Sequence, residues 1–443
     1  MKFLSSLVFL GGVGTVLAGT QLFGMNLSGF EFGCAITGYC PQGSNVIPPV
    51  KSLGGADGAG QMQHFVKDDG MSIFRLPVSW QYLTGSTIGP LSTKALANYD
   101  LLMQACLDTG AYCMIDIHNF ARWNGEIIGQ GGPTNAQFVD LWTQLTTAYA
   151  DNPFVIFELM NEPHDLDLTL WAATCQLVVN AIRTTETASH IIMLPGLNYT
   201  SAGTLVEGWG AAMAGITNPD KSTTNLLLDV HKYLDIDNSG DHTTCVTDNV
   251  ADTFDPVADW LRTNKRQAML TETGAGASTS CFTDFCAQNE AINANADVYL
   301  AYIAWAAGSV NSTYILDLAP SVKGKVYTDM QMTTECVIEP WKNSTAVAAP
   351  AWGLVLPAGT ASTSSSTTST TAKTTATKGA TTTKGGSAGS ASTSTSSFVS
   401  GATRTIVPAT PINPKNSASG LEVAGMQVMC VLMAGFAVLT FML

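Results

Sequence analysis

The chain has 443 residues, of which 12% are charged, and its formal net charge at pH 7 is −14. Binding to nucleic acid requires basic patches that displace counterions from phosphates, so this charge argues against a nucleic-acid partner and favours a neutral or cationic one. The length admits several average domains, or one large barrel of roughly 250 residues or more.

Residues 1–18 have the pattern of a secretory signal peptide. Lys2 precedes an apolar run over 3–17, and the small residue Ala18 stands before Gly19. An N-terminal membrane helix is the alternative, but the run is short for a bilayer span. Export predicts an oxidising destination, where the ten cysteines can form disulfides.

Short β-rich apolar runs alternate with helical patterns between residues 19 and 356. Strands are predicted at 21–25, 72–78, 112–118, 154–160, 191–196, 225–231, 267–271 and 298–305. Apolar residues at helical spacing predict helices at 96–107, 136–149 and 168–184. This alternation is typical of a parallel sheet closed into a (β/α)8 TIM barrel, so we expect 19–356 to form one α/β domain.

The composition changes after residue 356. Residues 357–415 are rich in Ser, Thr, Ala and Gly, which predicts a disordered, O-glycosylated linker or stalk. Residues 416–443 combine small residues, a polar spacer and an apolar tail, the pattern of a GPI-attachment signal. A transmembrane anchor at 426–443 is the alternative, at the short end of the spanning range. Both predict a protein held at the cell surface or wall.

Polar side chains follow most of the predicted strands at the point where each strand ends. They are Arg75, His118, Asn119, Asn161, Glu162, His231 and Glu272. Because active sites of (β/α)8 barrels lie at the carboxyl ends of the strands, we expect these side chains to meet at one mouth.

Two of these side chains are carboxylic acids, Glu162 in an Asn-Glu-Pro segment and Glu272 before a Gly-containing turn. An isolated strand-end glutamate is more often part of a surface salt bridge, but a second one three strands later changes that interpretation. Two carboxyls across a barrel mouth can serve as general acid and nucleophile of a retaining glycosidase. One must stay protonated and the other ionised, so burial should raise one pKa while a cation such as Arg75 lowers the other.

Seven segments between residues 24 and 341 form a more specific pattern. They are Phe-Arg-Leu-Pro-Val at 74–78, Ile-Asp-Ile-His-Asn at 115–119, Ala-Arg-Trp-Asn-Gly at 121–125, Met-Asn-Glu-Pro-His-Asp at 160–165, Asp-Val-His-Lys-Tyr-Leu-Asp at 229–235, Leu-Thr-Glu-Thr-Gly at 270–274, and Trp305. In this order they resemble glycoside hydrolase family 5, and specifically the secreted fungal endo-β-1,4-glucanases, or cellulases. Asn-Glu-Pro alone is shared by a whole clan of barrels, whereas the full series is specific.

The resemblance implies that Glu162 is the acid/base and Glu272 the nucleophile of a double displacement that needs no metal or organic cofactor. The supporting residues that it implies are Arg75 and Tyr233 at the nucleophile, Asn161 at the sugar 2-hydroxyl, His118 and His231 near the reacting sugar and the acid, and Trp305 beneath the −1 sugar. Trp123, in the loop after the third strand, is expected to contact substrate. Other tryptophans are more often packing residues.

Spacing leaves the disulfide connectivity open, although Cys34/Cys40 and Cys106/Cys113 could each close a short loop. The pairings that the resemblance implies are Cys34–Cys40, Cys106–Cys113, Cys245–Cys281 and Cys286–Cys336, with Cys175 free. Metal-ligand patterns such as Cys-x-x-Cys and His-Glu-x-x-His are missing from the sequence. Residues 235–241 resemble the start of a calcium loop, but Val246 stands where the bidentate glutamate belongs, so no metal site is expected.

The resemblance therefore implies a monomeric, endo-acting retaining enzyme that cleaves the β-1,4 bonds of cellulose or a related β-glucan. A specificity for mannan or for wall β-1,3- or β-1,6-glucan on the same barrel is the first alternative. An inactive wall-anchored glycan-binding protein is the second, but it should have lost a carboxyl or its Arg75 partner. No aromatic cellulose-binding module is visible in the sequence, so soluble or amorphous glucan is the expected substrate.

Overall fold

The computed structural model describes residues 16–41, 43, 45–184 and 190–356. The stalk at 357–415, the anchor signal at 416–443 and all but the end of the signal peptide lie outside these residues, so those assignments stay predictions. Strand β1 (Val16–Ala18) pairs antiparallel with β14 (Ala346–Ala348). None of the described helices has both the length and the apolar character required to cross a bilayer.

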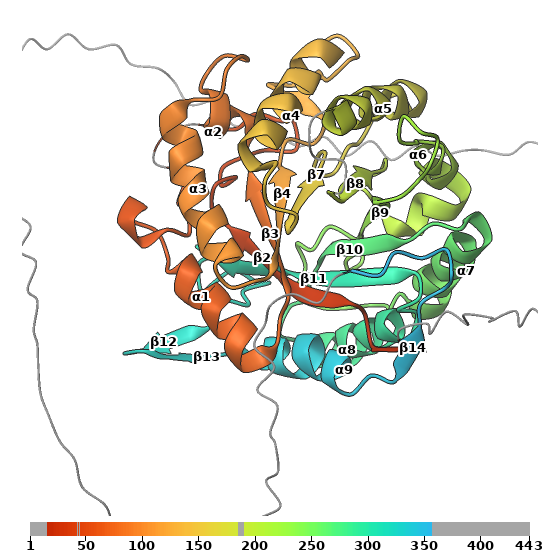
Figure 1. Ribbon diagram of the computed structural model, residues 1–443. Coiled ribbons are helices and arrows are strands. Elements are labelled where there is room, and N and C mark those ends of the chain that lie inside the picture. Colours follow the sequence, from red (N-terminus) through yellow and green to blue (C-terminus); the bar gives the residue numbers. More distant parts are fainter. Residues whose placement is uncertain (1–15, 42, 44, 185–189, 357–443) are drawn as a thin grey trace, which may run out of the picture. The chain divides into compact units, whose positions relative to one another are not determined.

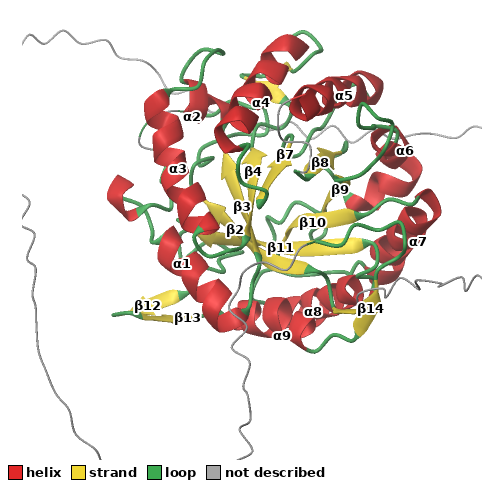
Figure 2. Cartoon of the chain, in the orientation of Figure 1, coloured by secondary structure: helices red, strands yellow, loops and turns green. Residues whose placement is uncertain are grey.

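Eight parallel strands of the described chain close into a barrel, with the spatial order β10-β11-β2-β3-β4-β7-β8-β9 (Figures 1 and 2). They are β2 (Leu22–Ser28), β3 (Ile73–Val78), β4 (Tyr112–Ile117), β7 (Val155–Glu158), β8 (Ile192–Pro195), β9 (Leu226–His231), β10 (Ala268–Thr273) and β11 (Tyr299–Gly308). Each overlaps one predicted strand, so the predicted (β/α)8 fold is confirmed. The main differences are at the carboxyl ends of β2 and β11, which run beyond the predicted ends to Ser28 and Gly308.

Helices surround the barrel (Figure 2). They are α1 (Gly58–His64), α2 (Trp80–Thr84), α3 (Thr93–Leu107), α4 (Asn135–Tyr149), α5 (Leu168–Thr184), α6 (Gly210–Ala214), α7 (Asp255–Asn264), α8 (Thr279–Ala294) and α9 (Glu339–Lys342). The three predicted helices correspond to α3, α4 and α5 and are confirmed. Helix α3 begins three residues earlier than predicted. The Ser92 side chain caps it by accepting a hydrogen bond from the Ala95 amide. The first turn is mostly polar, so the spacing of apolar residues could not reveal it.

Two further short antiparallel strand pairs lie outside the barrel sheet. They are β5 (Arg122–Trp123) with β6 (Glu126–Ile127), and β12 (Ser321–Lys323) with β13 (Val326–Thr328). Four disulfides join described residues, Cys34–Cys40, Cys106–Cys113, Cys245–Cys281 and Cys286–Cys336, and Cys175 is the free, buried cysteine of that part of the chain. These are the pairings that the resemblance implied, and they suit an oxidising compartment.

The barrel interior changes from apolar to polar along the strands. Near the amino ends it is filled by a buried cluster that includes Ile73, Met114, Ile156, Leu227 and Met269. Residues two apart on a strand point to the same side of the sheet. The next inward positions are Arg75, Asp116, Glu158, Asp229 and Thr271, all buried. The apolar layer thus supports a polar layer at the carboxyl ends, where the candidate site lies.

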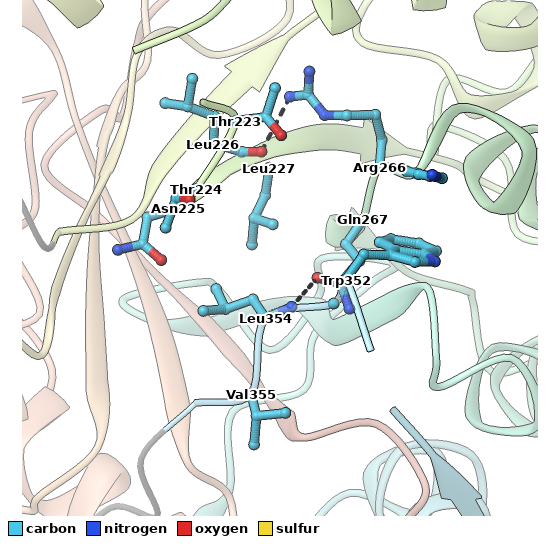
Figure 3. A pocket seen from close by; sticks show the side chains of 12 residues that line it. Thr223, Thr224, Asn225, Leu226, Leu227, Arg266, Gln267, Trp352, Leu354 and Val355 are labelled. Atoms are coloured by element: carbon cyan, nitrogen blue, oxygen red, sulfur yellow. Dashed lines mark hydrogen bonds between the residues drawn. The ribbon is translucent and has the colours of Figure 1, made fainter. Parts of the chain in front are cut away.

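The last described residues cover the opposite, amino-terminal end of the barrel. The Leu354 amide donates to Gln267 Oε1 at 2.6 Å, and the Leu354 carbonyl accepts from Gln21 at 2.8 Å. Leu354 and Leu356 also pack on the apolar cluster inside the barrel. A cavity of about 270 Å³ lies beside this segment (Figure 3). Besides residues 352–355, its lining consists of residues 223–227, before and at the start of β9, and residues 265–267, just before β10. It therefore lies away from the strand ends that carry the candidate site.

Truncating Leu354 should weaken this closure. We expect Leu354→Ala to lower the free energy of unfolding by about 1–2 kcal/mol, because a partly buried side chain loses apolar contact. Val355→Ala is the matched control, since Val355 is 41% exposed and should cost under about 0.5 kcal/mol. Urea denaturation of both variants measures the difference, and equal losses would contradict a closing role for Leu354.

Candidate active site

The barrel mouth brings the two predicted carboxyls together. Glu162 follows β7 and Glu272 lies in β10, and one oxygen of each lies within 4.8 Å of the other and of His231. His231 Nδ1 is 3.0 Å from Glu162 Oε1 and 4.0 Å from Glu272 Oε1. Carboxyls of retaining glycosidases stand about 5 Å apart, and those of inverting enzymes about 6.5–9.5 Å. The observed separation falls with the retaining enzymes and suits direct attack by one carboxyl on a sugar.

Glu272 is held rigidly through both of its oxygens. The Tyr233 hydroxyl donates to Oε1 and Arg75 Nη1 donates to Oε2, each at 2.8 Å. The pKa of Glu272 is not lowered, contrary to the expectation from sequence: burial raises it, and the positive charge of Arg75 only opposes that rise. Two donors that point at the carboxylate orient it and stabilise its ionised form, which is what a nucleophile requires.

Glu162 has a different environment. Among the described residues, Glu162 forms a side-chain hydrogen bond with His231. Arg75 forms an ion pair with Glu272 but none with Glu162 in this part of the chain. Burial raises the pKa of Glu162 to about 8, so this carboxyl is protonated at neutral pH. Its backbone has φ of 46°, a left-handed conformation that a non-glycine residue adopts at a cost of about 1–3 kcal/mol. The surrounding loop therefore holds an acid that can donate a proton.

This raised pKa predicts a pH-dependent stability. An unfolded glutamate titrates near its ordinary value, so the folded chain binds an extra proton between about pH 4.5 and pH 8. Stability should therefore fall as pH rises through that window. Glu162→Gln cannot ionise, so we expect it to be more stable than the parent by roughly 1–3 kcal/mol at pH 8 and equal to it near pH 4. Denaturation across pH tests this, with exposed Glu207→Gln as control; a pH-independent difference would contradict it.

Arg75 is the centre of a buried ion network. Its side chain is 0% exposed. Its guanidinium binds both oxygens of Glu158, at 2.6 and 2.7 Å, and lies 2.9 Å from Asp116 Oδ2 in addition to its contact with Glu272. Burial raises the pKa values of Asp116, to about 7, and of Asp229 well above its ordinary range. Burial thus works against ionisation of these carboxyls, and the positive charge of Arg75 opposes that effect.

Sequence reasoning missed Asp116, Glu158 and Asp229 as members of the site. Asp116 and Asp229 stand two residues before His118 and His231, so strand alternation turns each pair to the same side of the barrel. That spacing was the available signal. The spacing alone could not predict that these residues belong to the site, because it does not show that the barrel closes around them.

The network also determines the hydrogen-bonding state of His118 and Asn161. His118 Nδ1 lies 2.7 Å from Asp116 Oδ2, and Nε2 lies 3.3 Å from the Asn161 amide nitrogen, whose oxygen accepts from Arg75 at 2.7 Å. Burial lowers the pKa of His118 to about 3, so the ring is neutral. Nδ1–H therefore donates to Asp116 and Nε2 accepts from Asn161. Asn161 is locked in one orientation by both contacts.

Two pockets are lined by residues of the predicted site. One, of about 340 Å³, is lined by Trp305 and His118, whose rings lie nearly parallel with centroids 5.6 Å apart. Trp305 also donates to the Tyr314 hydroxyl at 3.0 Å. A second pocket, of about 510 Å³, is lined by Glu162, Tyr199 and polar side chains of residues 237–241. An aromatic wall with polar groups around it suits the faces and hydroxyls of sugar rings.

Trp123 lies in the loop after β4, the third barrel strand, as expected, but it is largely buried. It is 9% exposed and packs edge to face on Trp80, with ring centroids 5.3 Å apart. This burial gives no support to a substrate contact and makes Trp123 part of the hydrophobic core. Trp80 and Trp171 are fully buried, as the packing interpretation of such residues expects.

The remaining predicted site residues, Arg75, His118, Asn161, His231, Tyr233 and Trp305, all lie at the mouth with the two glutamates. A (β/α)8 barrel with a close carboxyl pair and two pockets lined by residues of the same site has the features of the glycoside hydrolase class.

Comparison with known proteins identifies the family. The family described as Cellulase (glycosyl hydrolase family 5) matches residues 22–308. Endoglucanase EG-II of Hypocrea jecorina is 53% identical over 326 residues, which cover 72% of this chain and 78% of that protein. The chain therefore belongs to glycosyl hydrolase family 5.

Solved structures agree with this assignment. The crystal structure of Cel5A (EG2) from Hypocrea jecorina (Trichoderma reesei) is 52% identical and has a TM-score of 0.71, covering 72% of this chain and 99% of its own. A more distant structure, XacCel5A in complex with cellopentaose, is 27% identical with a TM-score of 0.64, covering 73% of this chain and 99% of its own.

Proposed function

We propose that the chain is an endo-β-1,4-glucanase that works by a retaining double displacement, with Glu162 as acid/base and Glu272 as nucleophile. The observation that supports this assignment most directly is that the two adjacent carboxyls have different environments. Burial raises the pKa of both carboxyls, to about 8 for Glu162, but only Glu272 accepts hydrogen bonds from Arg75 and Tyr233, which stabilise its ionised form. Unequal environments of this kind separate a nucleophile from an acid.

In the first step, Glu272 attacks the anomeric carbon while Glu162 donates its proton to the departing glycosidic oxygen. The C–O bond to the leaving chain breaks and a glycosyl ester of Glu272 forms. In the second step, Glu162 removes a proton from water, which attacks the same carbon and releases Glu272. Configuration is retained because two inversions occur.

Neighbouring groups support the transition state. Asn161 uses one amide proton toward His118 Nε2, so its second is available for the sugar 2-hydroxyl, a contact that strengthens as positive charge develops on the sugar. Because Glu162 protonates the leaving group, the pocket that it lines receives the aglycone. The pocket beside Trp305 receives the glycone. Pockets on both sides of the cleavage point suit attack within a chain.

Preference for a β-1,4-glucan is supported by the endoglucanase relative and by the cellopentaose bound to XacCel5A. The test is initial rates of reducing-sugar release from carboxymethyl cellulose, mannan and laminarin, together with solution viscosity. We expect the fastest release from carboxymethyl cellulose and an early loss of viscosity, because internal cuts shorten chains quickly. Faster hydrolysis of mannan or laminarin would favour the alternative specificity.

We also infer that the enzyme acts as a monomer outside the cell, held by a GPI anchor. Disulfides and the N-terminal pattern support export, and the pattern at 416–443 supports the anchor. Release of activity from cells by phosphatidylinositol-specific phospholipase C distinguishes a GPI anchor from a transmembrane helix, which the lipase does not cut. Of the Asn-x-Ser/Thr sites, Asn26 should lack a glycan because its buried side chain bonds Arg75 and the Thr271 carbonyl.

A further inference from the structure

A second group of ligating side chains lies on the outer side of the barrel, apart from the active site. His64 ends α1, Asp69 ends the π-helical turn η2 (Phe65–Asp69) that follows, and Asp329 comes directly after β13. His64 Nε2 is 3.0 Å from Asp329 Oδ1 and 3.7 Å from Asp69 Oδ2. One ligand atom from each of these residues lies within 4.8 Å of the others.

The histidine ring is oriented by a fourth residue. His64 Nδ1 lies 2.6 Å from Asp68 Oδ2. Without an ion, Nε2 forms a hydrogen bond with Asp329 Oδ1. An ion would take the place of the Nε2 proton, while Nδ1–H still donates to Asp68. Metal-binding histidines are commonly held in this way, with a carboxylate on the ring nitrogen that does not bind the metal.

Asp69 supplies an independent observation that points to a ligand. It is 7% exposed, and its Oδ2 atom is buried with no hydrogen-bond partner. The nearest ring nitrogen, 3.7 Å away, is beyond hydrogen-bond range. A buried carboxylate oxygen without a partner costs free energy, and a bound cation removes that cost. Three carboxylates face one histidine here, so the cluster carries excess negative charge.

We propose that His64, Asp69 and Asp329 bind a divalent first-row transition-metal ion, Mn²⁺ or Zn²⁺. Ligand atoms about 2.1 Å from a metal lie about 3.0 Å apart at octahedral angles. The 3.0 Å between His64 Nε2 and Asp329 Oδ1 matches that spacing, and the 3.7 Å to Asp69 Oδ2 would have to shorten as the ion binds. Imidazole with carboxylates suits these ions, whereas Ca²⁺ takes oxygen ligands. The Asp329 side chain is partly exposed, which leaves access for water to complete the coordination.

The ion would fasten the β12–β13 hairpin to α1. Tyr327 of β13 stacks on His64, with ring centroids 5.4 Å apart, and its hydroxyl donates to Asp57 at 2.7 Å. Asp57 caps the start of α1. The hairpin therefore contacts both ends of the helix, and the metal completes the contact at the second end. Its role is structural and separate from the glutamate chemistry, so it is measured by binding and stability.

The test uses the full chain, stripped with a chelator and titrated with MnCl2 or ZnCl2 by calorimetry and by thermal unfolding. We expect one ion bound per chain and a rise in Tm of about 2–4 °C at saturation, because the ion binds only the folded state. CaCl2 and MgCl2 should give a smaller shift. Asp69→Asn and Asp329→Asn should each weaken binding at least about 10-fold.

Asp237→Asn is the matched control. Asp237 belongs to another acidic cluster, with Asp235 and His242, and the variant should bind like the parent. Binding that survives Asp69→Asn but is lost in Asp237→Asn would overturn the assignment, as would the lack of saturable binding by the parent. Should the Asp69 and Asp329 variants fold poorly by circular dichroism, pulsed EPR of the Mn²⁺-loaded parent decides. A ¹⁴N coupling from imidazole that disappears in His64→Gln supports the site, and no ¹⁴N coupling in the parent contradicts it.

Discussion

Replacing Glu272 with glutamine is expected to lower kcat on β-1,4-glucan by about 10⁴-fold or more, the size of effect seen when a covalent nucleophile is removed. The amide is nearly isosteric and keeps an acceptor oxygen for Arg75 or Tyr233. Binding of cello-oligosaccharides, measured by calorimetry, should therefore change by less than about 3-fold. Glu207→Gln, on the exposed surface, is the control and should retain full activity. Unchanged hydrolysis by Glu272→Gln would exclude it as the nucleophile.

The two carboxyls can also be told apart by rescue with azide and an aryl cellobioside whose leaving group needs no protonation. In Glu272→Ala, azide would attack the anomeric carbon directly and give the α-glycosyl azide by one inversion. In Glu162→Ala, the glycosyl ester still forms and azide would open it to the β-glycosyl azide. NMR of the products distinguishes the anomers. The opposite pairing of variants and products would reverse the assigned roles.

Replacing Arg75 with methionine is expected to destabilise the fold by about 3–5 kcal/mol at pH 7, because it leaves buried carboxylates without their cation. Arg75 contacts Asp116, Glu158 and Glu272. The loss should shrink toward pH 5, where protonation of those carboxyls removes the unpaired charge. Activity should fall by at least about 10²-fold as well, since Glu272 loses one of its two donors.

Arg262→Met is the control for this effect. Arg262 pairs with Asp297 at 2.7 Å, but its side chain is 38% exposed, so water screens the pair and its loss should cost under about 1 kcal/mol. Urea denaturation at pH 5 and pH 7 gives both comparisons. Equal losses for the two arginine variants, or a loss for Arg75→Met that does not change with pH, would contradict the account of the network.

Local sequence was enough to predict the architecture. Strand and helix periodicity depends on which side of an element is buried, and that is encoded in nearby residues. The eight strands and the three helices predicted from these periods are present. The strand-end rule then placed Glu162 and Glu272 at one mouth, because parallel strands of a closed barrel end on the same side.

Inward residues deeper in the barrel were not identified from sequence, because their meaning depends on closure. Asp116, Glu158 and Asp229 come from different strands, and only the closed barrel places them around Arg75. Trp123 is a second example of a property that local sequence does not determine. Its loop position suggested a contact with substrate, which stays a prediction, whereas only the tertiary fold decides that most of its side chain packs against Trp80.

Glu272 shows what can be predicted from sequence and what depends on the tertiary structure. Its chemical type and its place at the end of a hydrophobic strand could be predicted from the sequence. Strict alternation, however, would turn Glu272 away from the interior position that Thr271 occupies, since neighbours on a strand point to opposite sides. The register of β10 shifts between Leu270 and Glu272, and the carboxyl reaches Arg75 and Tyr233 inside the mouth. The sequence by itself determined the barrel and its glutamate pair. Only the tertiary structure decided where each carboxyl points and what holds it, because those contacts join segments far apart in the chain.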